Sequence, residues 1–367
     1  MNILMISGDR SVVEGKKSAF WYMLEEFSKH WGRIDIICPR ANVQGDGIRN
    51  VFGNVYFHPS SKGLLRQPAW IVKKGRELIE EHGHSVMSVH DYPPFYNGIG
   101  SEWLSRKMKV PYILEVHHIV GYPRPASFVE WIGRIMSHLF LAHDTYGAKA
   151  VRCVSQGTAK VLRKWGSDPD SVFIIPSFYL DKDLLRPRPC VKDYDLVCCG
   201  RLVSNKGINE IIEAISMTHE AKLLIIGDGP LRSSLEKKAE DLKISDRVKF
   251  SGWLPENEDV YKAIQSAKAF VMNSKSEGGP RVALEAMALG MPIITTKVGV
   301  MPDIVRDEEN GLFTTGSAKD LADKINKLLD YPTLRERVGQ EAKGVLDKFE
   351  KESLIREYAE FLQSMAK

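Results

Sequence analysis

The chain has 367 residues, of which 43% are hydrophobic and 27% are charged, and its formal net charge is +4. This length allows two domains of ordinary size, and the composition is that of a soluble globular protein. No run of 18 apolar residues occurs, which excludes a membrane-spanning helix. The N-terminal MNILMISGDR lacks the basic flank and cleavage site of a signal peptide, and the five cysteines lack metal-ligand spacing. We therefore expect a reduced, cytoplasmic protein.

Charge is distributed unevenly along the chain. Residues 1–180 hold 22 Lys and Arg against 16 Asp and Glu, together with nine of the ten histidines. The remaining residues hold 29 Lys and Arg against 31 Asp and Glu. The first half therefore favours an anionic partner. An excess of this size is also common on surfaces that bind no such partner, so both interpretations stand at this point.

The first half alternates short apolar runs, which predict strands, with helical patterns such as residues 19–31. The expected strands are residues 1–7, 33–39, 85–90, 111–118, 151–155 and 172–177. Alternation of this kind predicts a parallel sheet that is covered by helices on both faces.

Residues 180–195 interrupt the alternation with prolines, charges and no periodicity, so we place an interdomain linker there. The pattern then resumes. The expected strands are residues 195–200, 222–226, 248–253, 269–274 and 292–296, and the expected helices are 208–215, 231–242, 318–331 and 350–365. We therefore predict an α/β protein with domains at residues 1–183 and 192–348. In such sheets ligands bind outside the carboxyl ends of the strands, so two facing domains would form a cleft for a small molecule.

The segment SEGGPRVALEAMALGMP, residues 276–292, begins with a glycine turn and continues as a helix. Pro280 suits the first helical position, because its missing N–H would have no partner there. Gly278 and Gly279 remove side chains in front of the helix end. The free N–H groups can then bind an anion, most naturally a phosphate.

Two carboxylates flank this turn. Glu285 lies at i+4 from Arg281 and can accept hydrogen bonds from two hydroxyls of a ligand at the helix end. Glu277 lies on the turn and can accept from another polyol. The alternative is that Glu285 pairs with Arg281 on a solvated face and that Glu277 is an ordinary loop acid. The fixed spacing around Gly-Gly-Pro favours the functional interpretation.

The segment CCGRLVSNKG, residues 198–207, follows directly on an apolar strand. Arg201 and Lys206 would then lie at the carboxyl edge of the sheet, where a diphosphate would bind. Arg offers a fork to two phosphate oxygens, whereas Lys acts as a point charge. The alternative is a pair of solvated loop cations.

Two further strands run into loops at Gly227 and at the segment SGWLP, residues 251–255. Their backbone groups can contact the edge of a base, and Trp253, which precedes Leu254, can stack on it, although a tryptophan at a strand end more often packs. The dinucleotide fingerprint, the P-loop and an Asp-x-Asp pair are all missing. We therefore expect no nicotinamide, no other cofactor and no metal, with Arg201, Lys206 and the helix end neutralising the phosphates.

In the first half, the strand ILEVHH ends in His117 and His118, and the strand SVHD ends in His90 and Asp91. Alternation along a strand sends His117 and His118 in different directions. Because two successive strands end in histidines, we expect a polar site at this edge of the sheet.

These residues resemble a known family. Glu277, seven intervening residues and Glu285 are similar to the E-x7-E motif of the family-4 retaining glycosyltransferases, which have the GT-B fold of two Rossmann-like doubly wound sheets around a central cleft. The segments GRLVSNKG, IIGDGP, VKFSGWLP and NGLFTTG also resemble that family, specifically across residues 195–320 and more loosely before them.

The resemblance implies a role for each donor-side residue. Arg201 and Lys206 would hold the diphosphate of a sugar nucleotide, and Glu285 would bind the ribose hydroxyls. Glu277 would contact the donor sugar, with the backbone of residues 278–280 around the sugar and phosphate. The family commonly works without a metal and keeps the anomeric configuration. The usual proposal for how the family retains configuration is a front-face route, in which the diphosphate oxygen accepts the acceptor's proton.

On the acceptor side, the resemblance places His117 beside the anomeric carbon and the last helix, from about residue 350, across the first domain. The family often carries Gly-Gly after its first strand, where this chain offers only Gly15. It often has His-Asp in place of His117-His118, and Gly-Phe-Gly where this chain has Gly-Gly-Pro. The resemblance therefore does not identify the acceptor or the donor sugar nucleotide of this chain.

The function expected is retaining transfer of a hexose-type sugar from a nucleoside diphosphate sugar to a hydroxyl acceptor, in polysaccharide biosynthesis. The acceptor is a glycan, a lipid-linked saccharide or a small molecule, and no nucleic-acid partner is expected. The alternatives are a sugar-nucleotide 2-epimerase and a non-catalytic, sugar-nucleotide-binding partner subunit. Residues 62–79 and 125–143 mix apolar side chains with cations, which fits either peripheral contact with an anionic membrane or packing against the sheet.

Overall fold

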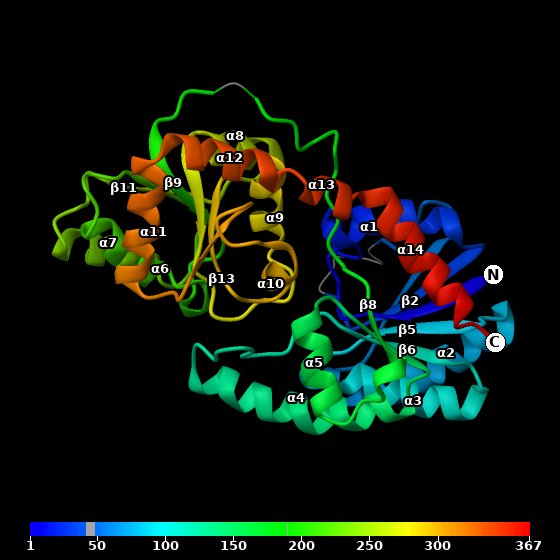
Figure 1. Cartoon of the computed structure of the whole chain (residues 1–367). Coiled ribbons are helices and arrows are strands. Elements are labelled where there is room, and N and C mark those ends of the chain that lie inside the picture. Colours follow the sequence, from blue (N-terminus) through cyan, green and yellow to red (C-terminus); the bar gives the residue numbers. More distant parts are fainter. Residues whose placement is uncertain (42–47, 189) are drawn as a thin grey trace. The chain divides into compact units, whose positions relative to one another are not determined.

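The computed structural model describes residues 1–41, 48–188 and 190–367, which form two compact units. Each unit contains a largely parallel sheet with helices on both faces, which confirms the predicted α/β class with two parallel-sheet domains (Figure 1). The segment Val120–Arg134 lies within the predicted first domain but is grouped with the second unit. The first unit consists of Met1–Ile119, Ile135–Ser177 and Glu352–Lys367, and the second of Val120–Arg134 and Phe178–Lys351.

The sheet of the first unit has the strand order β3-β4-β2-β1-β5-β6-β7-β8, and its strands are parallel except for the β3–β4 pair. The central strands read as continuous apolar runs because both of their faces are covered. In β1, for example, Ile3 and Ile6 are fully buried. The strands are β1 Asn2–Ile6, β2 Arg33–Cys38, β3 Asn50–Val51, β4 Val55–Pro59, β5 Val86–His90, β6 Tyr112–Val116, β7 Ala150–Cys153 and β8 Val172–Ile174.

Helices α1 and α14 cover one face of this sheet, and α2 and α3 cover the other (Figure 1). Tyr358 of α14 stacks on Phe27 of α1 with ring centroids 5.1 Å apart, which holds the last helix against the first unit. The helices are α1 Ala19–Phe27, η1 Ser28–His30, η2 Leu64–Arg66, α2 Gln67–His82, α3 Tyr96–Met108, α4 Phe128–Gly147, α5 Gln156–Lys164, η3 Pro169–Ser171 and α14 Lys351–Ser364.

The sheet of the second unit has the order β11-β10-β9-β12-β13-β14. Its core lies between the strands and α6, α7 and α11, while α8 and α9 lie on the other face. The strands are β9 Tyr194–Cys199, β10 Leu223–Ile226, β11 Val248–Gly252, β12 Ala267–Met272, β13 Ile293–Thr296 and β14 Leu312–Thr314. The helices are η4 Ser204–Lys206, α6 Ile208–Ser216, α7 Arg232–Asp241, α8 Asn257–Gln265, α9 Arg281–Ala288, α10 Met301–Ile304, α11 Ala318–Asp330, α12 Pro332–Ala342 and α13 Val345–Lys348.

Both sheets are doubly wound, and in both the direction of winding reverses beside the first strand of the unit. In the first unit β1 lies between β2 and β5, and in the second unit β9 lies between β10 and β12. At such a switch point the loops that leave the two neighbouring strands diverge to opposite faces, and ligands bind outside the carboxyl ends there. The loops after β9 and β12 are therefore the first place to look for a site in the second unit.

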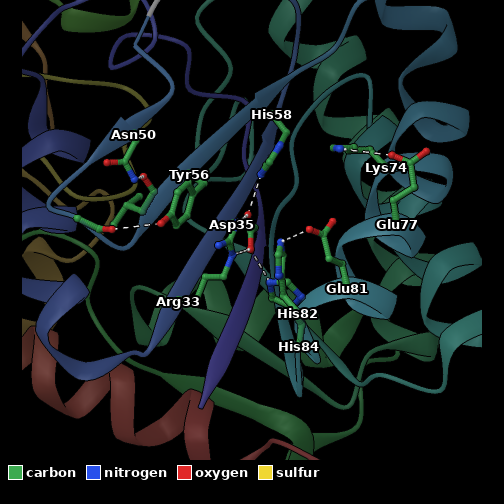
Figure 2. A network of polar contacts seen from close by, with 12 residues as sticks. Arg33, Asp35, Asn50, Tyr56, His58, Lys74, Glu77, Glu81, His82 and His84 are labelled. Carbon is green, nitrogen blue, oxygen red and sulfur yellow. Dashed lines mark hydrogen bonds and ion pairs between the residues drawn. The ribbon is translucent and has the colours of Figure 1, made fainter.

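The buried carboxylate of Asp35 in β2 is the centre of a cluster of polar contacts in the first unit (Figure 2). Its Oδ1 lies 2.7 Å from His58 Nε2, and its Oδ2 lies 2.8 Å from His84 Nε2 and 2.7 Å from Arg33 Nε. Burial acts to raise the pKa of Asp35. The hydrogen bonds from His58, His84 and Arg33 outweigh it and hold that pKa well below its usual range.

We predict that Asp35→Asn destabilises the protein by about 3 kcal/mol at pH 7, because it removes the buried charge that pairs with Arg33 and disturbs the hydrogen bond of the buried His84. The folded-state pKa of Asp35 is depressed, so its contribution is present above the unfolded pKa of about 3.9 and is lost as the pH falls below it. Urea denaturation from pH 7 to pH 3 should show the difference from wild type shrinking. The control is Glu77→Gln, whose partner Lys74 lies 3.3 Å away at the surface, with an expected loss under about 0.5 kcal/mol. Equal losses in both variants would contradict the account.

Candidate functional site

The loops after β9 and β12 are joined at the switch point of the second unit. Lys206 Nζ lies 2.6 Å from Glu277 Oε1, so the predicted phosphate cation and the predicted sugar contact are adjacent. Two further hydrogen bonds join the two loops, because the side-chain Nδ2 of Asn205 donates to the Ser276 carbonyl and the backbone N–H of Lys275 donates to the Asn205 carbonyl, both at 2.8 Å. These contacts fix the ammonium group of Lys206 at the carboxyl edge of the sheet.

Arg201 follows Gly200 on the loop after β9 and is exposed. Within the described residues its guanidinium has no ion pair, whereas the Lys206 side chain is only 27% exposed and is paired. The two predicted phosphate ligands thus differ in kind. The ammonium group of Lys206 is held in place by Glu277, whereas the guanidinium of Arg201 is exposed and available to an anionic ligand at the loop.

The start of α9 lies beside this junction. The helix begins at Arg281 with Pro280 as its N-cap, so the expectation that Pro280 occupies the first helical position is wrong by one residue. No side chain caps the helix at Pro280. A Cβ on Gly279 would lie 1.8 Å from Phe178 Cε1, and the Gly278 carbonyl accepts from Val300 N–H at 3.1 Å. Glycine at position 279 is therefore also required for packing, a reason that the sequence does not reveal.

Glu285 is 8% exposed and belongs to a buried hydrogen-bond group. Its Oε1 accepts from Arg281 Nε and from the Tyr261 hydroxyl, both at 2.9 Å. The expected alternative, a Glu285–Arg281 pair, is present, but Glu285 is buried whereas the Arg281 side chain is 38% exposed, so the pair does not lie on a fully solvated face. Burial and the neighbouring Glu285 carboxylate raise the pKa of Tyr261, so Tyr261 stays a protonated donor. Sequence analysis missed Tyr261, which comes from α8.

The predicted base-side residues lie at the ends of β10 and β11. Gly227 has φ +128°, and a Cβ there would lie 2.1 Å from the Gly200 carbonyl, so only glycine fits where the two loops meet. Its N–H donates to the Gly252 carbonyl at 2.9 Å. Trp253 is 72% exposed and does not pack, which leaves its ring free to stack on a ligand, while Leu254 is half-buried.

In the first unit, the predicted histidine edge is organised by Glu115 of β6, which is 1% exposed. Its Oε2 lies 2.9 Å from His117 Nε2, 3.1 Å from His90 Nε2 and 2.9 Å from Arg152 Nη1. Its Oε1 accepts from the Tyr358 hydroxyl of α14. The His90 and His117 rings lie 4.8 Å apart between centroids. Sequence analysis named the two histidines but missed Arg152 and Tyr358.

Desolvation lowers the pKa of His117 to about 4, although 38% of its side chain is exposed and the hydrogen bond to Glu115 acts in the opposite direction. His117 is therefore a neutral imidazole at pH 7, and Glu115 fixes its ring. Asp91 turns inward, where burial and Asp144 raise its pKa, and His118 is exposed. His117 and His118 both follow the end of β6 at Val116, so the expected alternation of their directions stays a prediction.

A cation is disfavoured at the histidine edge. His90, Glu115 and His117 offer ligand atoms that lie within 4.8 Å of one another, a spacing that a divalent ion can use. The guanidinium of Arg152, however, already lies 2.9 Å from the shared Glu115 oxygen and supplies the counter-charge. The expectation that no metal takes part stays a prediction.

Gly15 lies in an exposed turn after β1. Its φ is +80°, its N–H donates to the Val12 carbonyl at 3.0 Å, and a Cβ there would meet nothing within 4 Å. The positive φ explains the glycine, and its predicted place on the acceptor side stays a prediction. Across residues 1–41, 48–188 and 190–367, no helix has both the length and the apolar character needed to cross a bilayer.

Among curated proteins, the chain has relatives whose names describe them as sugar transferases. Sulfoquinovosyl transferase of Arabidopsis thaliana is 26% identical over 277 residues, which are 71% of this chain and 53% of that protein. A lipopolysaccharide core biosynthesis glycosyltransferase of Rhizobium meliloti is 34% identical over 167 residues, which are 45% of this chain and 48% of that protein. The chain thus spans about half the length of these curated relatives.

Solved structures share the fold at low identity. Sucrose-phosphate synthase from Thermosynechococcus elongatus has a TM-score of 0.84 and 20% identity over 99% of this chain and 98% of that chain. Anabaena HepE in complex with UDP has a TM-score of 0.77 and 19% identity over 99% of this chain and 100% of that chain. These likenesses confirm the GT-B fold.

Two family models match the chain in succession. The model for glycosyltransferase family 4 matches residues 18–179, and the model for glycosyl transferases group 1 matches residues 186–345. Together they cover most of the sequence and confirm the predicted resemblance to family-4 glycosyltransferases, whereas the E-x7-E motif and retention of configuration stay predictions. The chain belongs to the family-4, group 1 glycosyltransferases of GT-B fold.

Proposed function

We propose that the protein transfers a hexose-type sugar from a nucleoside diphosphate sugar to a hydroxyl acceptor, with retention of configuration and without a metal. Family membership supports sugar transfer, and HepE, which shares the fold, is solved with UDP and with UDP-glucose. The observation that carries the proposal is the Lys206–Glu277 pair at the switch point of the second unit. The comparisons support neither the epimerase nor the non-catalytic subunit.

The donor diphosphate would bind between Lys206, Arg201 and the start of α9. Lys206 is already held at the sheet edge by Glu277, so little side-chain freedom is lost when a phosphate oxygen joins it. The uncapped start of the eight-residue α9 adds backbone N–H groups and the helix dipole. These groups would stabilise the charge that develops on the leaving diphosphate, which is the main electrostatic requirement of the reaction.

The sugar and ribose would be oriented by the two carboxylates. Glu277 shares its Oε1 with Lys206, so a donor sugar hydroxyl that donates to Glu277 would be tied to the phosphate site. Glu285 would accept from the ribose, with its carboxylate fixed by Tyr261 and Arg281. Orientation of the reacting groups, instead of covalent participation by the protein, then supplies much of the rate enhancement.

His117 would act beside the anomeric carbon as a neutral hydrogen-bonding group. Its ring is fixed by Glu115, so one nitrogen is committed to the carboxylate and the other faces away from it. The acceptor's proton would pass to the leaving diphosphate oxygen in a front-face route. In that route His117 positions the sugar and transfers no proton.

The acceptor, which we propose to be a glycan or a lipid-linked saccharide in polysaccharide biosynthesis, would be met at the cytoplasmic face of a membrane. Exposed apolar side chains support contact with that membrane, since Leu65 before α2 is 84% exposed and Phe128 on α4 is 72% exposed. Ile71 of α2 is fully buried, so the packing interpretation holds for the inner side of this segment.

We predict that Lys206→Ala weakens donor binding at least tenfold, because a charge-assisted contact of about 1.5–3 kcal/mol is lost. A thermal-shift panel of UDP-glucose, GDP-mannose, ADP-glucose and dTDP-glucose identifies the donor on wild-type protein, and calorimetry then measures its affinity. The matched control is Lys237→Ala, which removes a surface lysine 3.0 Å from Asp241. The proposal fails if no sugar nucleotide binds the wild type, or if Lys206→Ala and Lys237→Ala bind the donor equally well.

We predict that His117 titrates near pH 4 in the folded protein, against about 6.5 in a model peptide. Its folded-state pKa is lowered, so stability supplied by the neutral ring is present above pH 6.5 and is lost as the pH falls toward 4. NMR titration of the imidazole signals, assigned with His117→Gln, measures the midpoint. A midpoint at or above about pH 6 would show that the ring is not held neutral by its surroundings.

A further inference from the structure

Two aspartates of the first unit face each other in its interior. Asp91 follows β5 directly and is 6% exposed, and Asp144 of α4 is fully buried. Within residues 1–41, 48–188 and 190–367, neither carboxyl group forms an ion pair with a lysine or an arginine. A buried carboxylate is costly unless its charge is paired and hydrogen-bonded. Some group other than lysine or arginine must therefore offset this charge.

One oxygen of each carboxyl group already has a partner. Asp91 Oδ1 accepts from the Gly98 N–H of α3 at 3.0 Å, and Asp144 Oδ1 lies 3.1 Å from His143 Nδ1. These contacts fix the orientation of both carboxyl groups. They leave one oxygen, Oδ2, on each side chain, and neither Oδ2 receives a hydrogen bond from a donor among the described residues.

The two Oδ2 atoms point to the same place. A Cβ built on Gly98 would lie 2.5 Å from Asp144 Oδ2 and 2.7 Å from Asp91 Oδ2, so both oxygens pack against the same glycine of α3. The two side chains lie within hydrogen-bonding distance of each other. A carboxylate only accepts, so two ionised carboxylates cannot form this bond. The bond forms when one of the two groups carries a proton, which then satisfies both unpartnered oxygens at once.

The surrounding side chains that the structure describes leave the two Oδ2 atoms without a cation. Arg106 of α3 lies 2.6 Å from Glu102 Oε1, and its side chain is 73% exposed. His143 is 63% exposed and contacts Oδ1 of Asp144 instead of Oδ2. The Tyr112 hydroxyl donates to the Asp144 backbone carbonyl at 2.8 Å and not to the carboxyl group. The titratable and charged groups around the pair are Tyr92 after β5, Glu102 and Arg106 of α3, Tyr112 of β6 and His143 of α4.

Burial and electrostatics act in the same direction on this pair. Burial, followed by the charge of Asp144, raises the pKa of Asp91 well above its ordinary value, and burial raises the pKa of Asp144. Two buried carboxyl groups this close to each other repel strongly when both are ionised. The proton then belongs to the pair and not to either residue alone.

We propose that Asp91 and Asp144 share one proton at neutral pH, and that the resulting acid–carboxylate hydrogen bond fastens α4 to the loop after β5. This loop matters because Asp91 follows His90, whose Nε2 lies 3.1 Å from Glu115 Oε2 at the histidine edge. Loss of the proton would drive the two carboxylates apart and shift this edge. The inference concerns the folded first unit and does not depend on the proposed sugar transfer.

The shared proton makes stability depend on pH. The folded-state pKa of Asp91 is raised above the unfolded value of about 3.9. The contribution of the proton is therefore fully present below the unfolded pKa and is lost as the pH rises through the folded-state pKa. Between these two values, one proton bound only in the folded state makes the unfolding equilibrium constant rise by about tenfold per pH unit.

The first test is infrared spectroscopy of the full chain at neutral pH. A protonated carboxylic acid has a carbonyl band at higher frequency than a carboxylate, and we expect one such band in the wild type. Asp91→Asn and Asp144→Asn should each lose it, because either substitution leaves one ionised carboxylate that the new amide N–H group can stabilise. Asp170→Asn, which changes an exposed aspartate of the same unit, is the matched control and should keep the band.

Urea denaturation from pH 5 to pH 9 tests the effect on stability. Relative to Asp91→Asn, the wild type should lose stability toward high pH, by up to about tenfold in the unfolding equilibrium constant per pH unit. Asp170→Asn should follow the wild type. Parallel pH profiles of the wild type and Asp91→Asn would contradict the shared proton.

The inference is also overturned if the wild type has no acid band, or if both asparagine variants keep it. A divalent ion that a chelator releases from the wild type, and that neither asparagine variant binds, overturns it too, because a metal would then take the place of the proton. The infrared measurement on the wild type needs no variant, so it decides the matter even where a substitution prevents folding.

Discussion

The contact between Lys206 and Glu277 is the interaction on which the proposed chemistry depends. The residues are 71 positions apart in sequence, and only the doubly wound strand order, with β9 beside β12, brings them within 2.6 Å. The apolar runs that must be buried on both faces require parallel strands with helices on either side of the sheet. A constraint of packing therefore places a cation and a carboxylate at the one edge where the loops diverge and a ligand can enter.

In the first unit, a buried carboxylate likewise organises the polar side chains around it. Glu115 holds His117 and His90 on one oxygen and Tyr358 on the other, and Arg152 neutralises its charge. A buried carboxylate of this kind is costly unless it is paired and hydrogen-bonded. The arrangement links the last helix to the orientation of His117, because Tyr358 lies on α14.

Much of the fold could be predicted from periodicity, and part of the site from residue type. Apolar runs located most central strands. Arg201 and Lys206 were named because they follow an apolar strand, and Glu277 and Glu285 because of their spacing around the Gly-Gly-Pro turn. Short elements such as the two-residue β3 and the three-residue β14 were not predicted, because they are too brief to show alternation. Two family models then matched the two halves of the chain, one each.

What sequence analysis missed was contact between distant segments. Tyr358 reaches Glu115 across 243 positions, and Phe178 explains Gly279 by touching the space a side chain would occupy. No local pattern marks such pairs, because their residue types are ordinary for a helix or a loop. The grouping of residues 120–134 with the second unit is of the same kind.

The most direct measurement of the central claim is a crystal structure of the protein with the sugar nucleotide that the thermal-shift panel selects. The account predicts a diphosphate oxygen about 2.8 Å from Lys206 Nζ, with further oxygens on the backbone N–H groups at the start of α9. A diphosphate bound elsewhere, with Lys206 still paired only to Glu277, would contradict it.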